Sequence, residues 1–220
     1  MSVTAIVGGS VRGALHQPDG EAAGGVVITH GAGGNFEMPL LVAVAEAFET
    51  AGFVVLRYNL PFRQKRPFGA PGSSAAALDQ AGLAEAIGWM RTKVSGKVFV
   101  GGQSYGGRQS SLLLSEQPGI TDALLLLSYP LHPPGKPEVL RTAHFSNIRK
   151  PALFVQGTKD PFGSPAELTD AIKLIPAPTR QVIVEGAGHE LLRGKFDIKA
   201  NVVDPLLDLA ANPRNRPARP

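Results

Sequence analysis

The sequence predicts an α/β fold in which a mostly parallel sheet of about eight strands carries helices on both faces. From Val26 onward, apolar runs of strand length alternate with segments of helical periodicity, the pattern that produces a parallel sheet. The apolar runs are continuous rather than alternating, as in residues 26–29 and 124–128, so both faces of these strands should be covered. An antiparallel hairpin should add edge strands at the N-terminus.

The N-terminal half begins with that hairpin, residues 3–7 and 11–16, which Gly-Gly-Ser joins and Pro-Asp-Gly closes. Its other elements are expected in the order strand, helix, strand, loop and helix: 26–29, 38–50, 53–58, 59–72 and 73–94. The loop is rich in proline and basic residues. Ser73 or Ser74 should cap the helix that follows.

The C-terminal half continues the alternation of strands and helices. The expected segments are strand 98–101, helix 108–117, strand 124–128, at most a short helix in 136–146, strand 151–156, helix 165–175, strand 181–185 and helix 199–211. No composition change marks a boundary, so residues 1–211 should form one domain. Residues 212–220 are expected to be a basic, disordered tail.

Composition restricts the classes of function. The net charge of +4 depends on three arginines in the last seven residues, so the near-neutral body gives no reason to expect nucleic-acid binding. The absence of cysteine excludes disulfides, thiolate metal sites and a Cys nucleophile. The chain contains no apolar run long enough to span a membrane. Its first residues also lack the basic leader and the apolar core of a signal peptide. We expect a cytoplasmic monomer or homodimer without a membrane partner.

The stretch from Val98 to Arg108 reads Val-Phe-Val-Gly-Gly-Gln-Ser-Tyr-Gly-Gly-Arg and predicts a strand, a sharp turn and a helix. A serine in such a turn is held above the sheet edge, where it can act as a nucleophile. Gly102 and Gly106 fit this interpretation because a side chain at either position would crowd neighbouring backbone. In a glycine-rich chain the alternative is a loop with an incidental serine, but the strand-turn-helix context favours Ser104.

A serine nucleophile needs a general base and a group that orients the base. After a turn of this kind the acid and then the histidine are expected along the chain. Asp160 follows one predicted strand and His189 follows the next, which places both at the carboxyl edge of the sheet, where ligands bind. The alternative for each is an ordinary loop residue. We predict a triad of Ser104, Asp160 and His189.

Acyl transfer also requires hydrogen-bond donors for the oxyanion of the transition state. One donor should be the backbone N–H of Tyr105, directly after the nucleophile. The other should come from the glycine-rich segment His-Gly-Ala-Gly-Gly after the strand 26–29, where we expect the N–H of Ala32. His30 should brace this loop rather than act as a base.

A dinucleotide site is the main rival for the same glycine-rich segment. Gly31-x-Gly33 after a strand, with Arg57 at the end of the next strand, resembles a phosphate-binding turn. Phe36 occupies the third glycine position, and this interpretation leaves Ser104 and His189 unexplained. The metal-binding spacings His-x-His and His-Glu-x-x-His do not occur, so we expect neither a cofactor nor a metal.

Five motifs in order resemble the small uncapped α/β-hydrolases, and within them a bacterial dienelactone-hydrolase-like branch related to a subunit of the NSL chromatin complex. The motifs are Thr-His-Gly-Ala-Gly-Gly-Asn (29–35), Arg-Tyr-Asn-Leu-Pro (57–61), Gly-Gly-Gln-Ser-Tyr-Gly-Gly-Arg (101–108), Tyr-Pro-Leu-His-Pro-Pro-Gly (129–135) and Phe-Val-Gln-Gly-Thr-Lys-Asp-Pro-Phe-Gly (154–163). The resemblance implies an α/β-hydrolase fold with a Ser-His-Asp triad. Dienelactone hydrolases proper use a Cys nucleophile, so that activity does not transfer.

The expected function is hydrolysis of small carboxylic esters or thioesters. Only about two dozen residues separate the strand 124–128 from the next one, which leaves no room for a lid domain. Arg57, Arg63 and Arg108 either face the cleft and bind a substrate anion or pair elsewhere. The open alternatives are a catalytically weak scaffold or binding protein, and amide cleavage or perhydrolysis by the same triad.

Overall fold

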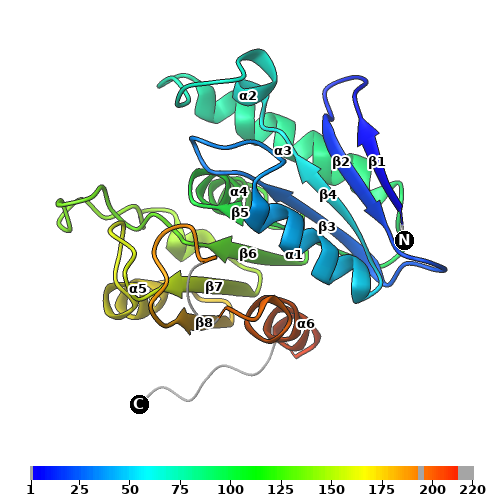
Figure 1. Ribbon diagram of the computed structural model, residues 1–220. Coiled ribbons are helices and arrows are strands. Elements are labelled where there is room, and N and C mark those ends of the chain that lie inside the picture. Colours follow the sequence, from blue (N-terminus) through cyan, green and yellow to red (C-terminus); the bar gives the residue numbers. More distant parts are fainter. Residues whose placement is uncertain (1, 193–195, 213–220) are drawn as a thin grey trace.

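A single eight-stranded sheet organises the chain (Figure 1). A computed structural model describes residues 2–192 and 196–212. The strand order is β1-β2-β4-β3-β5-β6-β7-β8. Its first two neighbouring pairs are antiparallel and the others are parallel. The predicted sheet with its N-terminal antiparallel hairpin is confirmed. The expectation of a disordered tail falls mainly on residues 213–220, which lie outside the described residues.

The N-terminal half contains β1 (Ser2–Ile6), β2 (Gly13–Gln17), β3 (Gly24–Thr29), α1 (Pro39–Thr50), β4 (Phe53–Tyr58), α2 (Pro61–Lys65) and α3 (Ala75–Arg91). Two expectations were wrong in detail. The predicted loop contains α2, which begins with Pro61 in the first turn, where its missing N–H costs nothing. Ser74 does precede α3, but it has helical backbone angles and its side chain makes no capping hydrogen bond.

The C-terminal half contains β5 (Lys97–Gln103), α4 (Tyr105–Glu116), β6 (Ala123–Leu127), the 3₁₀ turn η1 (Phe145–Asn147), β7 (Ala152–Gly157), α5 (Pro165–Ile172), β8 (Thr179–Val184), the π-helical turn η2 (Lys199–Val203) and α6 (Asp204–Ala211). The segment 136–146 forms only the start of η1. The last predicted helix changes from π-helical to α-helical geometry between Val203 and Asp204, just before Pro205, which has no N–H to donate to the preceding turn.

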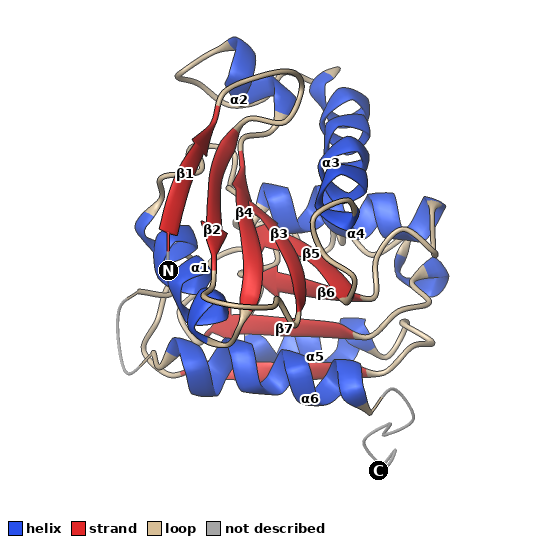
Figure 2. Ribbon diagram, turned by 90° about the vertical axis from the view of Figure 1, so that its right-hand side faces the viewer, coloured by secondary structure: helices blue, strands red, loops and turns tan. Residues whose placement is uncertain are grey.

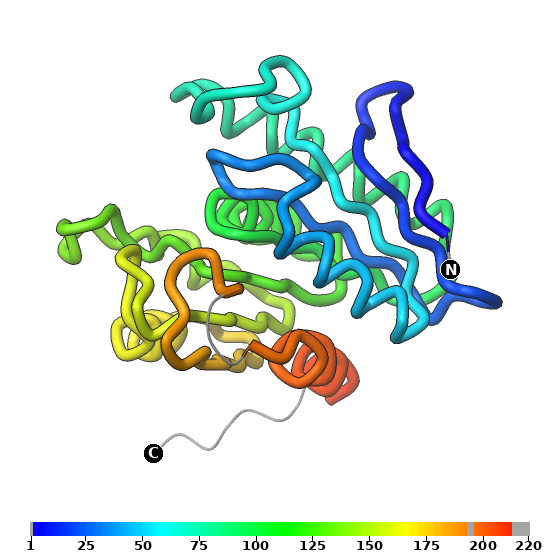
Figure 3. The backbone as a smooth tube through the Cα atoms, viewed as in Figure 1, coloured from blue at the N-terminus to red at the C-terminus, as the bar shows by residue number. Residues whose placement is uncertain are grey.

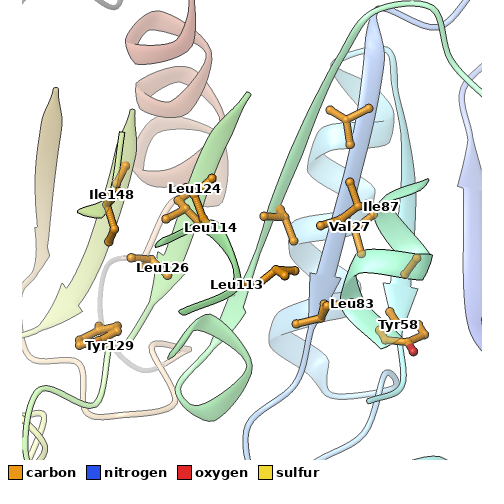
Figure 4. Packing of buried hydrophobic residues seen from close by; sticks show 14 of the residues in the cluster. Val27, Tyr58, Leu83, Ile87, Leu113, Leu114, Leu124, Leu126, Tyr129 and Ile148 are labelled. Carbon is orange, nitrogen blue, oxygen red and sulfur yellow. The ribbon is translucent and has the colours of Figure 1, made fainter. Parts of the chain in front are cut away.

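Two apolar layers enclose the sheet. One cluster joins the sheet to α1 and α6, and the other joins it to α3, α4 and α5; Figures 1 and 2 show α1 and α3 on opposite faces. Figure 4 shows Leu83 and Ile87 of α3 within the second cluster, and both side chains are fully buried. Because burial of each such side chain stabilises the fold by roughly 1.5–3 kcal/mol, the helices hold a rigid sheet beneath the loops.

The loops that follow the parallel strands gather at one edge of the sheet. In Figure 3 the connections after β3, β6 and β7 all lie on the left side of the molecule. The connection from β6 to β7, residues 128–151, contains no helix beyond η1. Among the described residues no helix is long and apolar enough to cross a membrane.

Candidate active site

Ser104 lies in the turn between β5 and α4, in a backbone conformation that a non-glycine residue rarely adopts. Its φ is 52° and its ψ is −115°. Two backbone hydrogen bonds hold the turn: Ser104 N–H donates to Leu127 O at 2.9 Å, and Arg108 N–H donates to Ser104 O at 2.9 Å. The side chain is half-buried and so stays accessible. Strain of this kind, about 1–3 kcal/mol, is concentrated at functional sites.

Gly102 and Gly106 flank this turn at places where the backbone packs closely against β3. A Cβ on Gly106 would lie 2.6 Å from His30 O and 2.7 Å from Thr29 Cγ2. A Cβ on Gly102 would collide with Thr29 O. The expected crowding at both positions is confirmed, and it brings Ser104 next to the end of β3.

Asp160 and His189 are in hydrogen-bond contact. His189 Nδ1 lies 2.8 Å from Asp160 Oδ2. The Asp160 side chain is fully buried, whereas the His189 ring is 22% exposed. Asp160 follows β7 and His189 follows β8, so two neighbouring parallel strands deliver the pair to the same sheet edge. Within the described part of the chain, the Ser104 hydroxyl makes no hydrogen bond to the ring; such bonds are often long before substrate binds.

Two neighbours, which the sequence analysis did not identify in these roles, fix the Asp160–His189 pair. Phe162 N–H donates to Asp160 Oδ1 at 2.9 Å, and the Phe162 ring packs on the His189 ring with 4.3 Å between centroids. Gln103 Nε2 donates to His189 O at 3.0 Å. Gln103 precedes Ser104, so this bond ties the histidine loop to the serine turn. The sequence signal was their adjacency to Asp160 and Ser104.

The predicted oxyanion donors are the backbone N–H groups of Ala32 and Tyr105. Neither donates a hydrogen bond within residues 2–192 and 196–212. Tyr105 is the first residue of α4, and its N–H lies beyond the reach of an intrahelical partner. The Ala32 loop is close to the serine, because a Cβ on Gly31 would lie 3.5 Å from Ser104 Cβ.

Arg63 of α2 holds the Ala32 loop through hydrogen bonds to its backbone carbonyls. Its Nη2 donates to Ala32 O at 2.9 Å and its Nε donates to Gly34 O at 2.7 Å. The same guanidinium also reaches the carbonyls of Gly69 and Arg66. Arg63 is buried and therefore orients the peptide that follows the Ala32 N–H.

His30 braces the same loop. Its Nε2 accepts the Leu60 N–H at 3.2 Å, and its Nδ1 lies 2.9 Å from Gly31 O. This arrangement requires the neutral tautomer with hydrogen on Nδ1. Burial lowers the pKa of His30 to about 4, and the charge of Arg63 contributes in the same direction.

Asp79, on α3, supports the Tyr105 side of the site and was not anticipated from the sequence. Tyr105 Oη donates to Asp79 Oδ2 at 2.7 Å, and Phe62 N–H donates to Asp79 Oδ1 at 3.0 Å. Burial raises the pKa of Asp79. The carboxylate thus connects α2, which carries Arg63, with the first residue of α4.

The three arginines considered as anion ligands have different surroundings. Arg57 donates to His16 Nε2 at 2.8 Å and to Phe36 O at 2.8 Å, so it serves the packing of β2, β4 and the loop before α1. Arg63 is occupied by backbone carbonyls. Arg108 alone of the three makes no hydrogen bond or ion pair through its guanidinium within the described residues.

Two surface grooves lie beside α2 and α3, and Ser104 is not among the residues that line either of them. A groove of about 470 Å³ beside α2 and α3 is lined by Arg12, Tyr58 and Glu85, among others, and does not include Ser104. Among the residues that the structure describes, no group of three His, Asp or Glu side chains is arranged to hold a metal ion. The residues of the candidate site lie on the loops that follow β3, β5, β7 and β8.

Comparisons with known proteins agree with this architecture. A family model described as an alpha/beta hydrolase domain matches residues 22–202. Dienelactone hydrolase from Anabaena variabilis is 21% identical, with 96% of this chain and 95% of that chain covered and a TM-score of 0.70. Est1E from Butyrivibrio proteoclasticus is 16% identical, with 96% and 98% covered and a TM-score of 0.73. A monoacylglycerol lipase from Paleococcus ferrophilus is 15% identical, with 91% and 98% covered and a TM-score of 0.71.

Proposed function

The chain belongs to the alpha/beta hydrolase domain family, and on that premise we propose that it is a serine hydrolase that cleaves small carboxylic esters or thioesters. The observation that carries the proposal is the strained Ser104 turn, with φ at 52°, at the same sheet edge as the Asp160–His189 pair. A fold retains such strain only where its surroundings enforce it, and functional sites are where this occurs most.

The proposed reaction proceeds through an acyl-enzyme. Ser104 Oγ attacks the acyl carbon while His189 Nε2 removes its proton, and Asp160 holds the ring through Nδ1. The N–H groups of Ala32 and Tyr105 stabilise the oxyanion of the tetrahedral intermediate. His189 then protonates the leaving alcohol or thiol. In the second half, His189 activates water, which releases the acid and regenerates Ser104.

The substrate class follows from the shape of the site. The connection between β6 and β7 carries only the 3₁₀ turn η1, so no helical lid from this connection covers Ser104. Phe162, half-buried against His189, offers one apolar wall. Short acyl groups that need little enclosure therefore fit the site best, and amide cleavage or perhydrolysis at the same residues is less supported.

The test is covalent labelling with a fluorophosphonate probe, read by intact mass, on wild type, Ser104→Ala and Asp160→Asn. We expect one label on wild type and none on Ser104→Ala. Turnover of p-nitrophenyl esters should disappear in Ser104→Ala and fall about 10⁴-fold in Asp160→Asn, because the His189 ring loses the partner that selects its tautomer. Circular dichroism should show that both variants remain folded.

Two results would contradict the proposal. Near-normal ester turnover by Ser104→Ala would remove Ser104 from the mechanism. No label and no turnover in folded wild-type protein would favour a scaffold or binding protein, the alternative suggested by the resemblance to a chromatin-complex subunit.

A further inference from the structure

Arg108 is a half-buried cation whose guanidinium has no hydrogen-bond or ion-pair partner among the residues that the structure describes. Its Nε is shielded from solvent and makes no hydrogen bond in the described structure, and no ion pair joins its guanidinium to an acid there. Leaving a buried donor unpaired costs free energy, and more so for a charged group. Arg57 and Arg63, by contrast, are both satisfied by protein atoms.

A second arginine shares this environment. Arg141 donates one hydrogen bond through its guanidinium, from Nη1 to Pro130 O at 3.2 Å, and no ion pair joins it to an acid within residues 2–192 and 196–212. Burial and then the nearby charge of Arg108 lower the pKa of Arg141. Burial and then Arg108 also lower the pKa of His144 to about 4. Arg108 thus has a second cation, Arg141, and a neutral histidine, His144, in its surroundings.

The placement of Arg108 relates this cationic patch, Arg108 and Arg141, to the nucleophile. Arg108 lies one helical turn after Ser104 and donates its N–H to Ser104 O. Side chains on a helix lean toward its N-terminus, so the Arg108 side chain leans back toward the turn that holds Ser104.

Hydrogen bonds fix Arg141 to residues 129–131, which follow β6. Its N–H donates to Leu131 O at 2.8 Å, and Tyr129 Oη donates to Arg141 O at 2.7 Å. Residues 129–131 follow β6, which is hydrogen-bonded to the serine strand β5. Leu131 also lies against Gly163, next to the Phe162 ring on His189.

We propose that Arg108 and Arg141 bind an anionic oxyacid group of the substrate, a carboxylate or a phosphate, beside Ser104. Neither guanidinium forms an ion pair with an acid in the described part of the chain, and both provide several N–H donors in the fork geometry that these anions accept. The inference rests on the proposed function and names its substrate class: esters or thioesters that carry a negative charge a short distance from the scissile bond.

The test compares esters that differ by one carboxylate. Monomethyl glutarate carries it on the acyl part and valeryl glycolate on the alcohol part, and methyl valerate is the neutral reference. In wild type, kcat/KM for at least one anionic ester should exceed that for methyl valerate. Arg108→Gln and Arg141→Gln should each lower this ratio by about 10- to 100-fold, the loss expected for a charge-assisted hydrogen bond. The ratio cancels any general effect on the chemistry.

Arg91→Gln is the matched control. Arg91 bonds Ile120 O and Asp122, before β6 and thus at the opposite edge of the sheet, so this variant removes the same charge far from Ser104. Its ratio should equal that of wild type. Competitive inhibition by glutarate and by glycerol phosphate separates the two ligand sources: the better inhibitor identifies the anion, and its advantage should disappear in Arg108→Gln.

Two results would overturn the inference while the proposed function stands: Ser104-dependent hydrolysis without preference for either anionic ester, or a preference that persists in both variants. If no ester is hydrolysed, the proposed function fails, and calorimetric titration of wild type and Arg108→Gln with glutarate and with phosphate decides the anion site by itself. Equal affinity in the two proteins, or no binding, would then contradict it.

Discussion

His30 is a histidine at the candidate site whose role is structural rather than catalytic. The ring is fully buried, accepts a hydrogen bond from Leu60 and contacts the Phe62 ring edge-on at 5.6 Å between centroids. A protonated ring could not accept the Leu60 N–H. The neutral ring therefore supports the loop that carries Ala32, because only this form accepts the hydrogen bond from Leu60.

This residue should make stability depend on pH. The pKa of His30 is about 4 in the folded protein against an ordinary value of 6.5, so the unfolded chain binds the proton more tightly. The free energy of unfolding should accordingly fall as pH drops from 6.5 to 4, by about 3 kcal/mol from this group. Urea denaturation of wild type and His30→Gln across pH 4–8 measures it.

His30→Gln should be less stable at pH 7 but should lose less stability on acidification. The difference between the two proteins isolates His30 from the carboxylates, which titrate in both. Parallel curves for the two proteins between pH 6.5 and 4 would show that His30 does not hold its proton weakly in the folded state.

The sequence predicted that Asp160 and His189 lie at the same sheet edge, and the structure places them in contact, whereas their catalytic roles stay a prediction. Both residues lie on the short segments just after β7 and β8, so the parallel strands alone bring them close. Arg57 and Arg63 have long side chains whose direction depends on carbonyls supplied by distant loops, such as Phe36 O and Ala32 O. No local sequence pattern encodes those partners. For that reason the sequence left the roles of Arg57, Arg63 and Arg108 open.

At the scale of elements, α2 is the segment that the sequence analysis missed. It has five residues, too few for a periodic apolar pattern, and an isolated helix of this length is unstable in water. Tertiary contacts stabilise it instead: Phe62 N–H donates to Asp79, and the Arg63 guanidinium spans the neighbouring loops. The helix is nevertheless central to the site, because it positions the Ala32 carbonyl.

We expect Arg63 to act as a positioning residue. In Arg63→Gln, kcat for ester hydrolysis should fall about 10- to 100-fold with little change in KM, because a displaced Ala32 N–H weakens only the oxyanion contact. Affinity for a trifluoromethyl ketone, which forms a tetrahedral oxyanion on Ser104, should fall in parallel. Affinity for the product acid should stay nearly constant, and steady-state and inhibition kinetics measure all three.

Arg66→Gln provides the control for this experiment. Arg66 is the exposed residue just after the same helix, and its guanidinium donates to Ala70 O; within the described residues no hydrogen bond joins this guanidinium to the Ala32 loop. Arg63→Lys keeps the charge but cannot span several carbonyls, so it should restore little activity. A loss of kcat without a loss of ketone affinity would assign Arg63 a purely structural role.

For the whole molecule, the strand order explains why the candidate site lies where it does. β4 and β5 pair with opposite sides of β3, so the connections lead to one side of β3 and then to the other. Ligands bind at such topological switch points in α/β folds. The Ala32 loop follows β3 and Ser104 follows β5. Alternation of strands and helices in the sequence predicted a parallel sheet, but this strand order depends on contacts between distant segments and was not readable from local patterns.

The connection between β6 and β7, which carries only the 3₁₀ turn η1, leads to a final prediction about kinetics. Lipases with a mobile lid become more active once a substrate exceeds its solubility, because an interface opens the lid. Here residues 128–151 are tied down locally, since Tyr129, Leu131 and Arg141 bond one another, and they form no helical cover. The hydrolysis rate of p-nitrophenyl esters should therefore saturate at monomeric concentrations and should not rise where the ester begins to form aggregates. Initial rates across that concentration, with light scattering to locate it, measure this, and a sharp increase at that point would indicate a cover that opens.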